Sequence, residues 1–149
     1  MAKCIYRKRS HSVYSIVLHT YFVTAYRRQC LTPKMIDRAQ DIAASVLLSK
    51  ECHLLECDGE PDHIHLLVDM HPSVAPGKVF GSVKSAISRT LRKEFEKQLR
   101  EYFKNWNKGL WGDQSYYASS GGAPIEVLEK YIQEHSRGSG SAVKKDRKP

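Results

Sequence analysis

Residues 61–70 read PDHIHLLVDM, and this stretch decides both the fold class and the candidate site. On a β-strand alternate side chains share a face, so His63 and His65 point to the same side. The other side carries an unbroken apolar row, formed by Ile64, Leu66, Val68 and Met70. One face of this strand is therefore expected to pack on a core. The two imidazoles on the other face are either a metal site or an idle polar surface.

The composition is that of a folded protein with a basic surface. A chain of 149 residues fits one domain with a substantial core. Lysine and arginine number 24 against 16 acidic residues, and the net charge of +8 favours polyanionic partners such as nucleic acid, although a basic surface without a specific partner is the alternative. We expect neither a membrane span nor a secretory signal. The 4 cysteines form no CxxC pair, which is typical of reduced thiols in a cytoplasmic protein.

The hydrophobic patterns predict the order strand, helix, strand, strand, helix, strand, and then an extra helix. Thr32 and Pro33 are a natural N-cap and first residue of the first helix, and Asp58-Gly59 is a hairpin turn signal. The predicted strands are 13–26, 53–57, 61–70 and 115–119, and the predicted helices are 33–49, 79–95 with a continuation toward 103, and 124–135. This order predicts an α+β, ferredoxin-like (RRM-like) βαββαβ fold. Its antiparallel sheet has helices on one face, so that His63 and His65 stand on the other.

The last predicted helix offers further candidate side chains. Tyr131 and His135 are four residues apart and hence neighbours on one helical face. A tyrosine hydroxyl can act as a nucleophile, and an imidazole can hold a divalent ion. Each residue also has a plain structural interpretation, because Tyr131 continues an apolar row and His135 suits the C-terminal end of a helix.

Four segments together resemble the single-tyrosine HUH transposases of insertion sequences that move as single-stranded DNA. They are YFVTAYRR (21–28), PDHIHLL (61–67), SYYASSGG (115–122) and LEKYIQEH (128–135). The match covers roughly residues 12–136 in the family's order and spacing. The histidine pair is a modest motif in isolation, and the downstream tyrosine helix makes it specific.

The resemblance implies that residues 1–136 form a single catalytic domain. The small and charged residues that follow predict a disordered basic tail at 137–149. His63 and His65 match the family's metal ligands, with Mg²⁺ or Mn²⁺ as the usual ion. Tyr131 matches the catalytic tyrosine, which attacks a DNA phosphate and becomes linked to the 5′ end. The family usually has glutamine, a further metal ligand, where this chain has His135, and imidazole also binds divalent metals.

The same resemblance implies partners and location. The expected substrate is single-stranded DNA with terminal hairpins, and the expected assembly is a homodimer in which the tyrosine helix often serves the partner subunit. The protein is expected in a prokaryotic cytoplasm, acting at the nucleoid. The candidates for phosphate contacts are Arg27, Arg28, Lys84, Arg89 and Arg92, and a solvated helix face is the alternative for each of those on a helix.

Two other functions remain open at this point. One is a non-catalytic RNA- or DNA-binding module on the same scaffold, although the RRM signature is absent from the sequence. The other is a domesticated relative that cleaves and joins genomic hairpins without moving an element. The sequence does not separate this second function from that of a transposase.

Overall fold

The computed structural model describes residues 7–9, 12–119, 130 and 132–134 of the chain. Its main sheet has the strand order β4-β5-β3-β6, and every neighbouring pair is antiparallel. The strands are β3 (Val17–Val23), β4 (His53–Glu60), β5 (His63–Asp69) and β6 (Tyr116–Ser119). This order is the one that βαββαβ connectivity produces, and the predicted ferredoxin-like fold is confirmed.

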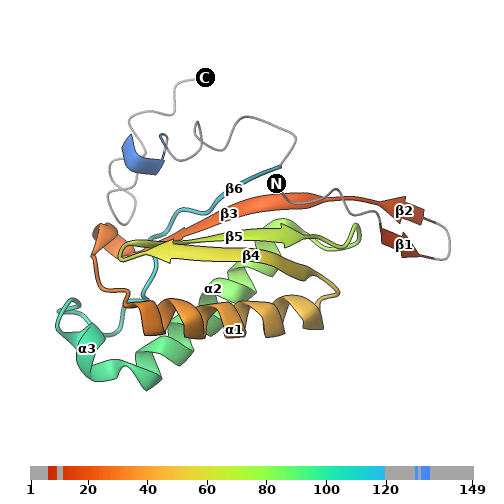
Figure 1. Cartoon of the computed structure of the whole chain (residues 1–149). Helices are drawn as coiled ribbons and strands as arrows, with labels where there is room; N and C mark the ends of the chain where they lie inside the picture. Colours follow the sequence, from red (N-terminus) through yellow and green to blue (C-terminus); the bar gives the residue numbers. More distant parts are fainter. Residues whose placement is uncertain (1–6, 10–11, 120–129, 131, 135–149) are drawn as a thin grey trace.

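Two long helices, α1 (Pro33–Ser49) and α2 (Pro76–Glu94), cover one face of the sheet (Figure 1). The helix α1 has its predicted bounds, because the Thr32 side chain accepts a hydrogen bond from the Met35 amide and Pro33 fits the first turn. A break at Phe95 separates α2 from the short α3 (Glu96–Arg100). None of the helices in the described ranges is long and apolar enough to cross a membrane.

The core lies between this helical layer and the sheet. The predicted apolar row of β5 is fully buried there, from Ile64 at 0% exposure to Met70 at 2%. Each such side chain contributes roughly 1.5–3 kcal/mol through burial. Its partners on the helices are Met35, Ala39, Ala43 and Leu47 of α1 and Val79, Phe80, Val83, Ile87 and Leu91 of α2.

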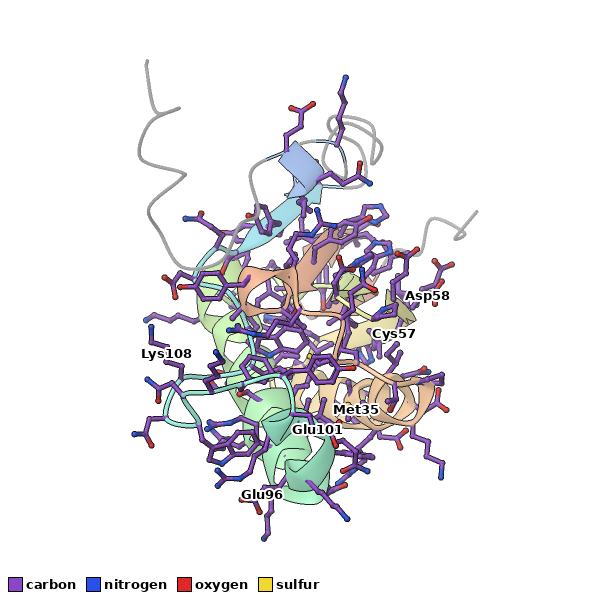
Figure 2. The ribbon with its side chains drawn as sticks, turned by 90° about the vertical axis from the view of Figure 1, so that its left-hand side faces the viewer. Met35, Cys57, Asp58, Glu96, Glu101 and Lys108 are labelled. Carbon is purple, nitrogen blue, oxygen red and sulfur yellow. The ribbon has the colours of Figure 1, made fainter. Side chains whose placement is uncertain are left out.

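Because the apolar row of β5 faces the helices, His63 and His65 face away from them, as predicted. We call this opposite side of the sheet the histidine face. A short helical turn containing Lys130 and Ile132–Glu134 lies over it in Figures 1 and 2, whereas Met35 lies on the helical side. The turn falls within the predicted helix 124–135, and the rest of that helix and the tail at 137–149 lie outside the described residues.

The predicted hairpin turn at Asp58-Gly59 is wrong by three residues. Strand β4 continues to Glu60, which pairs with His63, so Pro61 and Asp62 make the turn. Backbone bonds from elsewhere hold this turn, since the Pro61 carbonyl accepts from Leu31 N and the Asp62 carbonyl accepts from Thr24 N. Gly59 is instead a strand residue that allows close approach, because a Cβ there would lie 3.0 Å from the His63 carbonyl oxygen.

The predicted first strand, 13–26, is divided in the structure. A separate hairpin, β1 (Arg7–Arg9) with β2 (Ser12–Tyr14), precedes β3. At the other end β3 stops at Val23, and the chain turns through η1 (Ala25–Arg27). Tyr26 and Arg27 have φ values of 57° and 52°, a left-handed conformation that lies outside the region of regular β-strands.

Candidate active site

The two histidines of β5 lie beside a histidine and a tyrosine of β3. His19 and Tyr21 share the histidine face because they pair with Leu67 and His65 across the strands. The Tyr21 ring stacks on His65 with centroids 4.6 Å apart, and it lies 5.8 Å from the His63 ring. His19 Nδ1 lies 3.0 Å from His65 Nε2. The imidazoles are thus held in an aromatic layer rather than left free on a polar surface.

His63 has a charged partner at the preceding position. Its Nδ1 lies 2.9 Å from Asp62 Oδ1, and Arg27 donates to Asp62 Oδ2 from Nε at 3.2 Å and from Nη2 at 3.0 Å. Burial raises the pKa of the Asp62 carboxyl, but the hydrogen bond with His63 and the Arg27 charge outweigh it, and the pKa lies below its usual value. Asp62 is therefore a carboxylate at neutral pH.

The side chains that could hold a metal ion meet at this end of the sheet. Ligand atoms of Glu60, Asp62 and His63 all lie within 4.8 Å of one another. Tyr21, Arg27, Glu60 and His63 line a pocket there, together with Ile132 and Gln133 of the short turn. Carboxylate oxygen suits Mg²⁺, and a mixture of carboxylate and imidazole suits Mn²⁺, so the donor set fits a divalent cation.

The short turn joins the site through the Ile132 side chain and the Gln133 backbone carbonyl. Ile132 is 5% exposed and packs in a cluster with Tyr21, Val23 and Tyr116 on the histidine face. The Gln133 carbonyl accepts a hydrogen bond from Arg27 Nη1 at 3.4 Å. The predicted nucleophile Tyr131 and the predicted ligand His135 lie outside the described residues, whereas Ile132 and Gln133, which follow Tyr131 in the sequence, line this pocket.

One border of the histidine face is acidic. Glu56, Asp58 and Glu60 alternate along the edge strand β4, and each pairs across to a residue of the histidine face. All three side chains are exposed. Negative charge thus lines the β4 edge beside His63 and His65.

Comparison with known proteins identifies the family. Residues 12–135 match the family described as transposase IS200 like. The chain belongs to this transposase family. A transposase of this kind is in general a DNA strand transferase, which agrees with the basic charge of the chain.

Individual relatives match along most of their length. The ISDra2 transposase TnpA of Deinococcus radiodurans is 26% identical over 121 residues, covering 81% of this chain and 84% of that protein. The transposase for insertion sequence element IS200 of Salmonella typhimurium is 26% identical over 124 residues, covering 83% of this chain and 79% of that protein. The crystal structure of a putative transposase from Deinococcus radiodurans aligns with a TM-score of 0.77 at 22% identity, covering 90% and 99% of the two chains. This last likeness concerns the fold.

The five basic side chains predicted to contact DNA occupy different environments in the transposase. Arg27 is part of the His63 pocket, and Arg28 stacks over the rings of Tyr26 and Phe103. Lys84 Nζ donates to the carbonyls of Gly112 and Gln114, and burial lowers the pKa of its amine.

Arg92 stacks over Trp106 and donates to the Trp106 carbonyl. Arg89 differs from the other four because its side chain is exposed, and it lines, together with Lys84, an open basin beside the 109–115 segment. Of the five, Arg89 has the surroundings best suited to a phosphate contact.

The sequence reasoning missed four residues of the pocket region. His19 and Tyr21 share the two-residue period of β3 and could have been assigned to the histidine face from that period alone. Asp62 and Glu60 owe their positions to the hairpin turn, which was predicted three residues too early. Because the turn was misplaced, the sequence reasoning could not predict that Glu60 and Asp62 lie beside His63.

Proposed function

We propose that the transposase cleaves and rejoins single-stranded DNA at the ends of an insertion sequence through a covalent link to Tyr131. The observation that supports this most is the position of the short turn. Ile132 and Gln133, the residues that follow Tyr131, contact or line the pocket of His63. The contacts of Ile132 and Gln133 support the proposal that Tyr131 acts at the same site as the histidine pair.

The proposed reaction is a transesterification. The Tyr131 hydroxyl loses its proton and attacks the phosphorus of the scissile phosphodiester, forming a bond to the 5′ phosphate. The bond from phosphorus to the 3′ oxygen breaks, and that oxygen takes a proton to leave a 3′-OH. A 3′-OH of another end then attacks the phosphotyrosine, and Tyr131 is released. One phosphoester bond replaces another at each step, so no external energy source is required.

The chain's own residues would prepare this reaction in distinct ways. His63, His65 and His135 are the proposed metal ligands, and Glu60 is a further candidate carboxylate donor because its ligand atom lies within 4.8 Å of those of Asp62 and His63. Membership of the family suggests a divalent metal, and bound Mg²⁺ or Mn²⁺ would supply Lewis-acid polarisation of the phosphate. Arg27 brings positive charge to the pocket, although its contact with Asp62 already balances part of it.

The substrate and assembly follow the same proposal. The expected DNA carries terminal hairpins, and exposed Arg89 is the proposed phosphate contact. We propose a homodimer in which the tyrosine helix can serve either subunit, with residues 1–136 as the catalytic domain. The proposed place of action is the cytoplasm, at the nucleoid.

A covalent adduct tests the proposal directly. We expect wild-type protein, incubated with its element's single-stranded hairpin ends and Mn²⁺, to give a protein–DNA adduct that survives denaturation. Tyr131→Phe should abolish the adduct and retain hairpin binding, whereas the matched control Tyr102→Phe, which changes an exposed tyrosine beside α3, should retain both. Hairpin binding without any wild-type adduct would favour a non-catalytic binding protein instead.

A further inference from the structure

A continuous chain of polar contacts connects the histidine of the pocket to the short turn beside Tyr131. His63 Nδ1 contacts Asp62 Oδ1 at 2.9 Å, and Asp62 Oδ2 accepts from Arg27 Nη2 at 3.0 Å. Arg27 Nη1 then donates to the Gln133 carbonyl at 3.4 Å. This series of contacts links the hairpin turn at Asp62, the loop at Arg27 and the short helical turn at Gln133. None of its hydrogen bonds belongs to the β-sheet.

The first contact constrains the His63 ring. A carboxylate only accepts hydrogen bonds, so Nδ1 must carry the proton that lies between it and Asp62. In neutral imidazole this leaves Nε2 as the nitrogen with a lone pair, which is the one that can hold an ion. Metal-binding histidines are commonly oriented by a carboxylate in this way.

The second contact constrains Asp62 itself. Both of its carboxylate oxygens are engaged, Oδ1 with His63 and Oδ2 with Arg27. Its side chain is only 13% exposed. An aspartate held in this way has both oxygens fixed by protein donors, which suits it to orient its neighbour.

The backbone around Arg27 is built to maintain the contact. Arg27 has a left-handed φ of 52°, which is uncommon for a residue with a Cβ. Arg27 N donates to the Thr24 carbonyl at 2.9 Å, and Thr24 N donates to the Asp62 carbonyl at 2.9 Å. The loop that carries Arg27 and the turn that carries Asp62 are therefore fastened together. Unusual backbone conformations of this kind cluster at functional sites.

The geometry points to Asp62 and Arg27 as positioning residues of the transposase. Asp62 fixes His63 with Nδ1 protonated and Nε2 available to the divalent ion. Arg27 fixes Asp62 and holds the short turn through the Gln133 carbonyl, because its planar fork can reach two partners at once. This inference rests on the proposed function for its purpose, but its structural part can be tested without DNA.

The Asp62 arm is tested on metal-free protein by ¹⁵N NMR of the histidine rings at about pH 8.5, two units above the reference imidazole value. We expect His63 in the wild type to be the Nδ1–H tautomer. Asp62→Ala should yield a tautomer mixture and weaken Mn²⁺ binding, measured by calorimetry, by about tenfold to a hundredfold. Asp62→Asn retains a carbonyl acceptor, so it should keep the tautomer and lose less affinity.

The Arg27 arm is tested through the Ile132 methyl signal, which lies in a cluster with the rings of Tyr21 and Tyr116. Arg27→Gln should shift this signal toward its position in unfolded protein and leave the His63 tautomer unchanged. Arg27→Lys should give an intermediate shift. The matched control is Arg100→Gln, which removes an exposed arginine that pairs with Glu96 on α3 and should change nothing.

Several outcomes would overturn the inference. They are an unchanged His63 tautomer in Asp62→Ala, a loss of Mn²⁺ affinity as large in Asp62→Asn as in Asp62→Ala, and an Ile132 signal in Arg27→Gln equal to that of the control. The second result would make Asp62 a direct ligand. Failure of the wild type to form a DNA adduct would instead count against the proposed function, since none of these measurements uses DNA.

Discussion

His19 Nδ1 lies 3.0 Å from His65 Nε2, and the two rings stack with centroids 5.2 Å apart. A hydrogen bond between two imidazole nitrogens needs one proton and one lone pair. If one of these two nitrogens carries the proton, the other must present its lone pair, so the tautomers of the two rings are coupled. A histidine of β3 thus becomes part of the environment of a proposed metal ligand on β5.

The first prediction concerns this pair. We expect His19→Ala to weaken Mn²⁺ binding by about tenfold, because His65 loses the partner that fixes its ring and its tautomer. Calorimetric titration of metal-free protein measures the effect. His53→Ala, a histidine at the far end of the sheet where β4 pairs with Asp69, is the matched control and should leave affinity unchanged. Equal affinities for both variants and the wild type would show that His19 has no role in metal binding.

The second prediction separates two basic residues of α2. Arg89→Gln should weaken binding to hairpin DNA and lower the slope of log affinity against log salt by about one, without changing the melting temperature. Lys84→Met should reduce the free energy of unfolding by about 1–2 kcal/mol, because the carbonyls of Gly112 and Gln114 lose their donor.

Fluorescence anisotropy at several salt concentrations and urea denaturation provide the two measurements for these variants. Arg100→Gln controls for the loss of a surface charge. If Lys84→Met changed only DNA affinity, and Arg89→Gln only stability, the two assignments would have to be exchanged.

The third prediction tests the start of α1. Thr32→Ala removes the side-chain oxygen that accepts from the Met35 amide, and we expect the free energy of unfolding to fall by about 1 kcal/mol. Ser45→Ala changes an exposed residue in the middle of the same helix and should be neutral or slightly stabilising. Urea denaturation of both variants measures the difference. Equal stabilities would mean that Thr32 does not act as a cap.

The fourth prediction concerns alkaline pH. Burial raises the pKa of both the Cys30 and the Cys57 thiols to about 11. In the unfolded chain a thiol titrates at about 8.5, so above that pH the unfolded state holds fewer protons than the folded one. The free energy of unfolding should therefore fall as the pH rises from about 8.5 toward 11.

Urea midpoints across this pH range measure the decline. Cys57→Ala removes one of the two titrating groups, so its stability should decline less steeply than that of the wild type. The difference between the two curves isolates the thiol from the lysines and tyrosines that also titrate. Parallel curves would contradict the raised pKa of Cys57.

Much of the fold could be predicted because it depends on local periodicity. The row Ile64, Leu66, Val68 and Met70 has a period of two, and α1 has a helical period with a cap at Thr32, so both elements lie where the patterns place them. The hairpin turn and the end of β3 were misjudged because bonds between distant segments decide them. Thr24 N and Leu31 N fasten the turn at Pro61 and Asp62, and no local signal reveals those bonds.

In the site, too, the features that depend on local periodicity could be predicted, and the contacts between distant segments could not. His63 and His65 share a face because of strand alternation, which is a local property. The contacts of His63 with Asp62 and of Asp62 with Arg27 depend on a left-handed turn at Tyr26 and Arg27, residues that rarely adopt this conformation. The roles of Tyr131, His135 and the histidine pair stay predictions until the adduct and metal experiments are carried out.

The acidic row on β4 has a consequence for the route of the DNA. Glu56, Asp58 and Glu60 form a negative fence along one border of the histidine face, and they repel a phosphodiester chain within about one Debye length, roughly 10 Å at 0.1 M salt. This negative charge makes the opposite edge of the sheet, at β6, the more favourable side for the approach of a polyanion. On the proposed function, a DNA strand would therefore cross the sheet from β6 toward the proposed cation site beside β4.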